Sequence, residues 1–133
     1  MKHSSESNIL LFSSRIEIKP LSVNKCWQGK RFKTDDYINY EKELLYTLPA
    51  FNLNKSTNPL HVNILLGVSN LAFDVDNAVK PLLDVLQKKY NFDDRYIFRL
   101  IVEKVLVRKG FEFIEFNIKK YRPFVETLAE TES

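Results

Sequence analysis

Residues 60–86 read LHVNILLGVSNLAFDVDNAVKPLLDVL, and they contain the clearest strand and helix patterns of the chain. Over residues 60–68, apolar side chains alternate with polar side chains or glycine, which is typical of a half-buried β-strand. From residue 77 onward, the apolar side chains recur at helical spacing, which indicates a helix with one buried face. We therefore expect a strand over 60–68, a short connection, and a helix over 77–89 with Pro81 in its first turn.

Outward from this stretch, the same patterns predict the rest of a small domain. A basic stretch over residues 21–33 contains aromatic side chains and is expected to form a loop or a short hairpin. Thr34 is expected to cap the helix that follows it. The other expected elements are strands over 9–19, 96–108 and 111–119, the last two joined by a tight turn at Lys109-Gly110, and a helix over 35–48 that ends before Pro49. Their order predicts an α/β (α+β) fold, a small single domain with a mixed sheet of about four strands packed by two helices.

The two ends of the chain differ from its middle in composition. Residues 1–8 and 122–133 are polar and lack a periodic pattern, so we expect a disordered tail before, and a flexible tail after, one domain over residues 9–121. No apolar run approaches the ~20 residues that cross a bilayer, and the start lacks the apolar stretch of a signal peptide. The expected location is cytoplasmic, with no membrane partner.

Composition restricts the chemistry that this chain can perform. Cys26 is the only cysteine, and His3 and His61 are the only histidines. An internal disulfide and a zinc site of the Cys/His type are therefore excluded. Few histidines are available for a catalytic Ser-His-Asp unit. A bound metal would need oxygen ligands, which favours Mg²⁺ or Mn²⁺. The net charge of +3 and the sequence pI of about 8.9 are compatible with a polyanionic partner without requiring one.

Several aspartates lie close together in the sequence at the expected ends of regular elements. Asp74 and Asp76 precede the second helix, and Asp93-Asp94 follow it. Packing several acids together is unfavourable unless a cation neutralises them, because like charges raise one another's pKa. The structural alternative is that Asp74 and Asp76 are a turn residue and a helix cap. This alternative explains either aspartate alone, but it explains poorly why both occur together with Asp94. The pattern therefore favours a metal site.

Two lysines near these acids each have a structural and a functional interpretation. Lys80 lies four residues after Asp76, so it can form an ion pair along the helix or reach a scissile phosphate. Lys104 shares an expected strand face with apolar residues, where it can extend to the edge of the sheet or serve a site. The sequence leaves both alternatives open.

Residues 73–104, FDVDNAVKPLLDVLQKKYNFDDRYIFRLIVEK, resemble the signature of the RusA family of Holliday junction resolvases, the crossover junction endodeoxyribonucleases. The shared pattern is D-x-D-N-x-x-K, a further aspartate, a DD pair, and a strand that bears a lysine. Residues 20–24, which precede Trp27, agree more loosely with an N-terminal element of the family. The resemblance implies catalytic, metal-binding aspartates at Asp74, Asp76 and Asp94, a catalytic Lys80, and supporting roles for Asn77, Asp84, Asp93 and Lys104.

The basic stretch before the first helix is the expected DNA-contact surface. Its candidate DNA-binding residues are Asn24, Lys25, Trp27, Lys30, Arg31 and Lys33, with Phe32 among them. A solvated loop is the structural alternative. The chain departs from the family pattern in two places, because residues 69–73 lack a basic run and residues 87–92 lack a glycine. The first departure bears on DNA contact, and the second bears on local loop geometry.

The resemblance implies a homodimer that binds branched DNA, in particular the four-way junction, and nicks two opposing strands in recombination and repair. The implied cofactor is Mg²⁺, for which Mn²⁺ can substitute, with no organic cofactor. Two alternatives stay open: a catalytically inactive protein that binds branched DNA, and a nuclease that acts on other branched DNA. A phosphatase of the haloacid dehalogenase type is disfavoured, because too few residues follow Asp76 to complete that fold.

Overall fold

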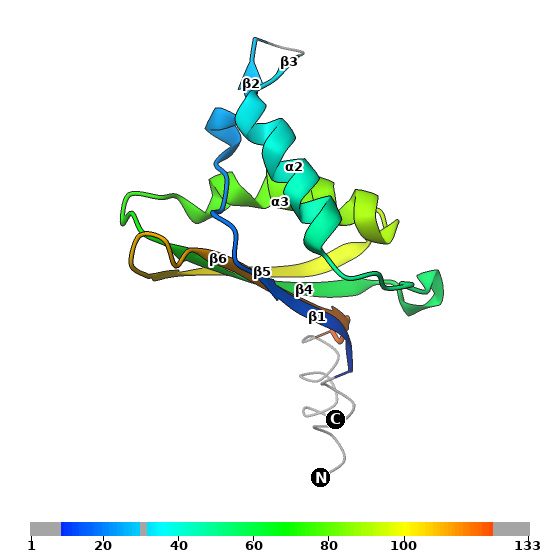
Figure 1. Cartoon of the computed structure of the whole chain (residues 1–133). Helices are drawn as coiled ribbons and strands as arrows, with labels where there is room; N and C mark the ends of the chain where they lie inside the picture. The colour runs from blue at the N-terminus through cyan, green and yellow to red at the C-terminus, as the bar shows by residue number, and fades with distance from the viewer. Residues whose placement is uncertain (1–8, 30–31, 124–133) are drawn as a thin grey trace.

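The computed structural model describes residues 9–29 and 32–123. The expected tail over 1–8, and residues 124–133 of the expected tail at the other end, lie outside the described residues. Within the described residues, two α-helices lie on one face of a four-stranded mixed sheet (Figure 1). The expected α+β class is therefore confirmed. The described part of the chain contains no helix that is both long and apolar enough to span a membrane.

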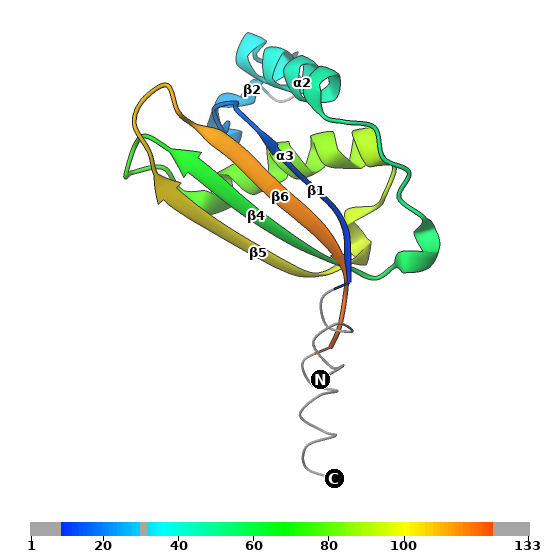
Figure 2. The ribbon, with the colours of Figure 1, turned by 60° about the horizontal axis from the view of Figure 1, so that its bottom comes forward.

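The main sheet has the strand order β1-β6-β4-β5, which can be followed in Figure 2. Strand β4 pairs in parallel with β5 and antiparallel with β6, and β1 pairs antiparallel with β6. A separate hairpin, β2–β3, lies near the start of α2 (Figure 1). The elements are β1 (Leu10–Ile16), η1 (Val23–Lys25), β2 (Trp27–Gln28), β3 (Phe32–Lys33), α2 (Asp35–Thr47), η2 (Lys55–Thr57), β4 (Leu60–Val68), α3 (Val75–Tyr90), η3 (Asp94–Tyr96), β5 (Ile97–Leu106) and β6 (Phe113–Lys120).

Strands β5 and β6 follow one another in the chain but do not pair. The tight turn that the sequence predicts at Lys109-Gly110 is present, because the N–H of Phe111 donates to the carbonyl of Arg108 at 2.9 Å, but this turn does not close a hairpin. Residues 107–112 instead carry the chain past the end of β4, which lies between the two strands. Alternation shows that a segment forms a strand, but it does not show which strand lies beside it.

Helix α3 begins at Val75 rather than at residue 77, so the expectation that Pro81 lies in its first turn is wrong. The helix starts earlier because Asp74 has an extended backbone and its carbonyl accepts the N–H of Asn77 at 3.2 Å. Pro81 is therefore buried inside the helix, in its second turn. Its missing N–H leaves the carbonyl of Asn77 without the usual helical partner.

Helix α2 begins as the sequence predicts. The hydroxyl of Thr34 accepts the N–H of Tyr37 at 3.2 Å, which caps the first turn. Asp35 and Asp36 lie in that turn, where negative charge stabilises the positive end of the helix. The short hairpin that precedes α2 is one of the two structures expected for the basic stretch.

The core lies between the helices and one face of the sheet. Leu66 of β4 and Phe116 of β6 are almost fully buried there, against Leu82 and Leu86 of α3 and Leu44 of α2. Burial of these apolar side chains holds α3 across the sheet. The residues that follow β4 and precede α3 are thereby brought to one end of β4, and they lead to Asp74.

Candidate active site

The carboxylates of Asp74 and Asp76 lie at the start of α3. Asp74 occupies the N-cap position, but its side chain makes no capping hydrogen bond. Both residues are exposed. Among the described residues, neither carboxylate has a hydrogen bond or an ion pair. The contacts give no support to a capping role, and both carboxylates are available to a ligand.

Lys104 holds the loop that leads to Asp74. Its ammonium donates to the carbonyl oxygen of Leu71 at 2.8 Å and to that of Phe73 at 2.5 Å. The half-buried lysine lies on β5 beside Leu66, on the face of the sheet that the helices cover. Loops are usually the most mobile part of a domain, so two hydrogen bonds from a strand restrict this one. Lys104 therefore positions the backbone that precedes Asp74.

Lys80 forms its ion pair with Asp84 rather than with Asp76. The distance from Nζ to Oδ1 is 3.1 Å, one helical turn further along α3. The hydrogen bond and the charge of Asp84 raise the pKa of Lys80, and the charge of Asp94 adds to this effect. The Lys80 side chain is 66% exposed. Because exposed ion pairs are weak, its ammonium remains able to exchange Asp84 for another anion.

The connection after α3 brings Asp94 back to the helix. The N–H of Asp94 donates to Oε1 of Gln87 at 2.9 Å. Asn91 ends the helix in the left-handed conformation, with φ of 56°, and so replaces the glycine that this connection lacks. The side chain of Asp93 accepts the N–H of Arg95 and pairs with its guanidinium at 3.0 Å, so it is used within the turn.

The donor chemistry of Asp74, Asp76 and Asp94 suits a hard divalent cation, because Mg²⁺ prefers carboxylate oxygens. Across residues 9–29 and 32–123, however, no group of three or more Asp, Glu, His or Cys side chains is close enough to hold a metal ion. The three carboxylates make no hydrogen bonds to other described side chains. The oxygen atoms of the three carboxylates are therefore suitable ligands for a metal ion, and no other described side chain occupies them. Their present arrangement, however, does not form a three-ligand site.

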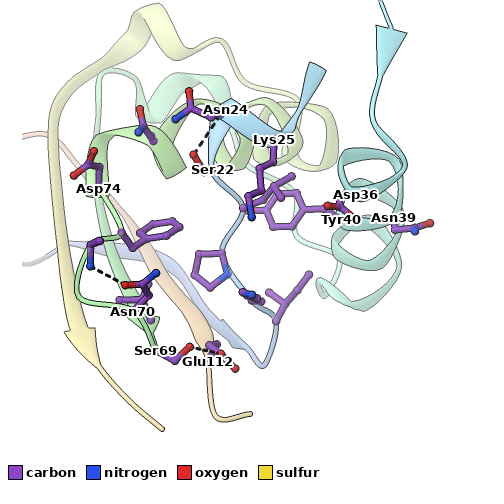
Figure 3. Close-up of a pocket in the computed structure, with 18 of the residues that line it drawn as sticks. Ser22, Asn24, Lys25, Asp36, Asn39, Tyr40, Ser69, Asn70, Asp74 and Glu112 are labelled. Atoms are coloured by element: carbon purple, nitrogen blue, oxygen red, sulfur yellow. Dashed lines mark hydrogen bonds between the residues drawn. The ribbon is translucent and has the colours of Figure 1, made fainter. Parts of the chain in front are cut away.

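A cleft of about 730 Å³ opens beside Asp74. Asp74 lines it from the start of α3, and Asn24 and Lys25 line it from the segment around η1 (Figure 3). Asn77 of α3 is also part of its lining. The fold thus brings two of the DNA-binding candidates to the same cleft as one candidate metal ligand and one supporting residue. The cleft lining does not include Asp76, Lys80, Asp84, Asp94 or Lys104.

Two of the remaining DNA-binding candidates, Trp27 and Lys33, belong to the β2–β3 hairpin. Trp27 is 45% exposed. Its ring and the ring of Tyr37 pack edge to face, with their centroids 5.7 Å apart. Lys33 is half-buried, and its ammonium lies 2.8 Å from the carboxylate of Glu41. Its charge is therefore already used within the protein. Lys30 and Arg31 lie outside the described residues.

Two residues of α2 that no sequence pattern singles out, Tyr37 and Glu41, contact these groups. Glu41 is buried and lies 2.8 Å from the ammonium groups of both Lys33 and Lys88. Burial acts to raise the pKa of Glu41, but the hydrogen bonds from the two lysines outweigh it and lower the pKa. Tyr37 donates to Asp84 at 3.5 Å, and burial together with the charge of Asp84 raises the pKa of its phenol. Asp84 and Lys88 are each 47 residues away from these partners, so no local pattern indicates the contacts.

Comparison with known proteins adds a finding that is independent of this geometry. A family model described as endodeoxyribonuclease RusA matches residues 22–116 of the chain. The matched stretch covers more than half of the chain and contains every candidate catalytic and DNA-binding residue discussed above. A search of curated proteins found no match.

Proposed function

Because this chain belongs to the RusA endodeoxyribonuclease family, whose members resolve DNA junctions, we propose that it nicks two opposing strands of a four-way junction by phosphodiester hydrolysis. The observation that carries the proposal is the pair of carboxylates on Asp74 and Asp76, which have no partner among the described residues, together with the place of Asp74 in a cleft that Lys25 also lines. Acidic groups beside a basic one are the parts that metal-assisted cleavage of a phosphodiester requires. The reaction would serve recombination and repair.

The proposed cofactor is Mg²⁺, with Mn²⁺ as a substitute, and the family generally depends on a divalent metal ion. Asp74, Asp76 and Asp94 are the residues that would hold it. When bound, the ion would make a water molecule more acidic and polarise the phosphate. Asn77 lies on the cleft wall next to Asp76, where its amide can orient the DNA backbone. No organic cofactor is needed for this chemistry.

Lys80 is proposed to stabilise the negative charge that develops on the scissile phosphate. Asp84 raises the pKa of Lys80 further above its ordinary range, and Tyr37 donates a hydrogen bond to Asp84 in turn. When a phosphate approaches, the ammonium would exchange one anionic partner for another without changing its own charge. Lys104 would contribute indirectly, as a positioning residue for the loop before Asp74.

The DNA backbone is proposed to enter along the cleft wall formed by Asn24 and Lys25. A lysine there can neutralise a phosphate, and the exposed ring of Trp27 can stack on a base. Lys33 is better explained as the anchor of the hairpin on Glu41 than as a DNA contact. Lys30 and Arg31 keep a proposed role in DNA contact on the basis of their place in the basic stretch.

The acting form is proposed to be a homodimer, because paired nicking needs two active sites. The proposed location is the cytoplasm, on the grounds that the substrate is DNA and that the only cysteine, Cys26, is a free thiol.

The proposal is tested with a synthetic four-way junction whose strands are labelled one at a time. Wild-type protein should nick two opposing strands only when Mg²⁺ or Mn²⁺ is present, and Asp76→Asn should abolish both nicks. Asp35→Asn is the matched control, because it neutralises an exposed aspartate in the first turn of the other helix. This control should cut at the wild-type rate.

Two other results would replace this proposal with one of its alternatives. A junction that is bound but never cut with either ion would indicate a binding protein without activity, which the absence of a three-ligand group among the described residues makes a serious alternative. Faster cutting of flaps or forks than of four-way junctions would indicate a nuclease for other branched DNA.

A further inference from the structure

Strand β5 forms an edge of the main sheet, and within the described residues only β4 pairs with it. The strand is ten residues long, and several of its apolar side chains are exposed: Ile101 by 44%, Val105 by 42% and Leu106 by 54%. A long apolar edge is a template for another strand, so proteins usually shorten it, interrupt it or cover it. The exposure of this edge therefore points to a partner.

The free backbone groups of this edge belong to every second residue. Val107, just past the strand, donates its N–H to the carbonyl of Val68 on β4 at 2.8 Å. Successive residues of a strand direct their N–H and C=O groups to opposite sides. The register with β4 is regular from Arg99 onward, because its only shift occurs before that residue. Leu100 and Val102 therefore direct their backbone groups away from β4, toward the open edge.

We propose that a second copy of this chain pairs with β5 in antiparallel orientation, about a two-fold axis that passes beside Ile101. In that register Arg99 faces Glu103 of the second copy, and Ile101 faces Ile101 of the second copy. Leu100 faces Val102 of the second copy, and their outward backbone groups form the hydrogen bonds. The pairs made by Arg99 and Ile101 then occupy non-hydrogen-bonded positions, where opposing side chains are closest.

Charge selects this register over its neighbours. An axis beside Val102 would place Glu103 against Ile101, and an axis beside Glu103 would place two carboxylates opposite one another. In the described part of the chain, the side-chain carboxylate of Glu103 has no hydrogen bond or ion pair. Arg99 donates from Nη1 to the carbonyl of Arg122 at 3.2 Å, which leaves further guanidinium N–H groups for a carboxylate.

Such a pairing would join two main sheets into one continuous sheet, with both copies of α3 on the same side. Lys104 lies within the paired stretch, and its ammonium holds the loop before Asp74. The partner strand would therefore cover the stem of a lysine that positions the active site. Two active sites on one side of a single sheet are what the proposed paired nicking needs, and in this respect the inference rests on the proposed function.

The register is tested by cysteine cross-linking of the full-length chain. Ile101→Cys places two thiols opposite one another across the axis, so mild oxidation should yield a disulfide-linked dimer. Val105→Cys is the matched control, because Val105 is equally exposed on the same strand but would face residue 97 of the second copy. It should stay monomeric on a non-reducing gel, and the native Cys26 is buried and should not react. Equal cross-linking of both variants, or none of Ile101→Cys, would overturn the register.

The charge pairing is tested by sedimentation without DNA or metal, so that a failure of this inference is distinguishable from a failure of the nuclease. Arg99→Glu and Glu103→Arg should each weaken dimerisation about tenfold or more, and the double variant should restore it. A wild-type chain that sediments as a monomer would overturn the proposal. If removal of residues 124–133 then produced a dimer, that segment rather than a second copy would be the occupant of the edge.

Discussion

The ammonium of Lys104 lies 2.8 Å from the carbonyl oxygen of Leu71, and this contact ties the edge strand β5 to the loop that leads to Asp74. A second hydrogen bond, to the carbonyl of Phe73, strengthens the tie. The contact also explains why a lysine stands on a strand face that otherwise carries apolar residues. Its stem packs with that face, and its charged end reaches backbone oxygen atoms at the edge.

Removal of the two hydrogen bonds from Lys104 to the loop before Asp74 should slow cleavage without weakening DNA binding. Lys104→Met keeps most of the packing of the stem but loses both hydrogen bonds, so we expect the single-turnover rate to fall roughly 10- to 100-fold. The Kd for the junction should change little. Lys104→Arg retains donors and should recover part of the rate. A parallel loss of binding and cleavage in Lys104→Met would instead indicate direct contact with DNA.

Lys25 and Lys33 should differ in how they affect the salt dependence of junction binding. Lys25 lines the cleft beside Asp74, so Lys25→Ala should reduce the slope of log K against log salt by about 1. Lys33→Ala should leave the slope unchanged, because its ammonium is already bound by Glu41. Fluorescence anisotropy over a salt series measures both slopes. Equal reductions would show that Lys33 leaves Glu41 when DNA binds.

Glu41 should stabilise the fold in a pH-dependent manner. Its pKa in the folded protein is lowered from an ordinary value of 4.5, so its contribution is present above that pH and is lost as the pH falls through the folded pKa. Glu41→Gln should reduce the free energy of unfolding by about 1–3 kcal/mol near neutral pH, and the difference should shrink below about pH 4.5. Urea unfolding at several pH values measures this. Glu43→Gln, an exposed glutamate on the same helix, is the control and should show a much smaller effect.

Gly67 should not tolerate a side chain, because a Cβ there would overlap the ring of Phe113 on the paired strand β6. The Arg15 guanidinium covers that ring from its other side, 3.7 Å from the centroid, so the ring has little room to move. Gly67→Ala should therefore destabilise the protein by about 1–3 kcal/mol in thermal or urea unfolding. The same substitution in a Phe113→Leu background should cost less. An equal cost in both backgrounds would point to a backbone effect instead.

The sequence was sufficient to predict most of the regular elements and to name the candidate site residues, whose roles stay predictions. Alternation in β4 and helical spacing in α3 involve residues that are neighbours in the chain, and Thr34 caps a helix only three residues away. Such patterns arise from local geometry, so they can be read without knowledge of the fold. The resemblance carried by residues 73–104 likewise identified the family, which the match over residues 22–116 confirms.

Tertiary structure decided which of these local pieces meet. Three contacts join groups that are separated by loops or by other elements. Strand β4 lies between β5 and β6, Gln87 accepts a hydrogen bond from the backbone of Asp94, and Lys33 forms an ion pair with Glu41. The sequence shows that Lys104 needs a polar partner, but only the folded chain shows that the partner is the backbone before Asp74. The physical reason is that periodicity reports which side of an element is buried, whereas the choice of partner depends on how the whole chain packs to bury those sides together.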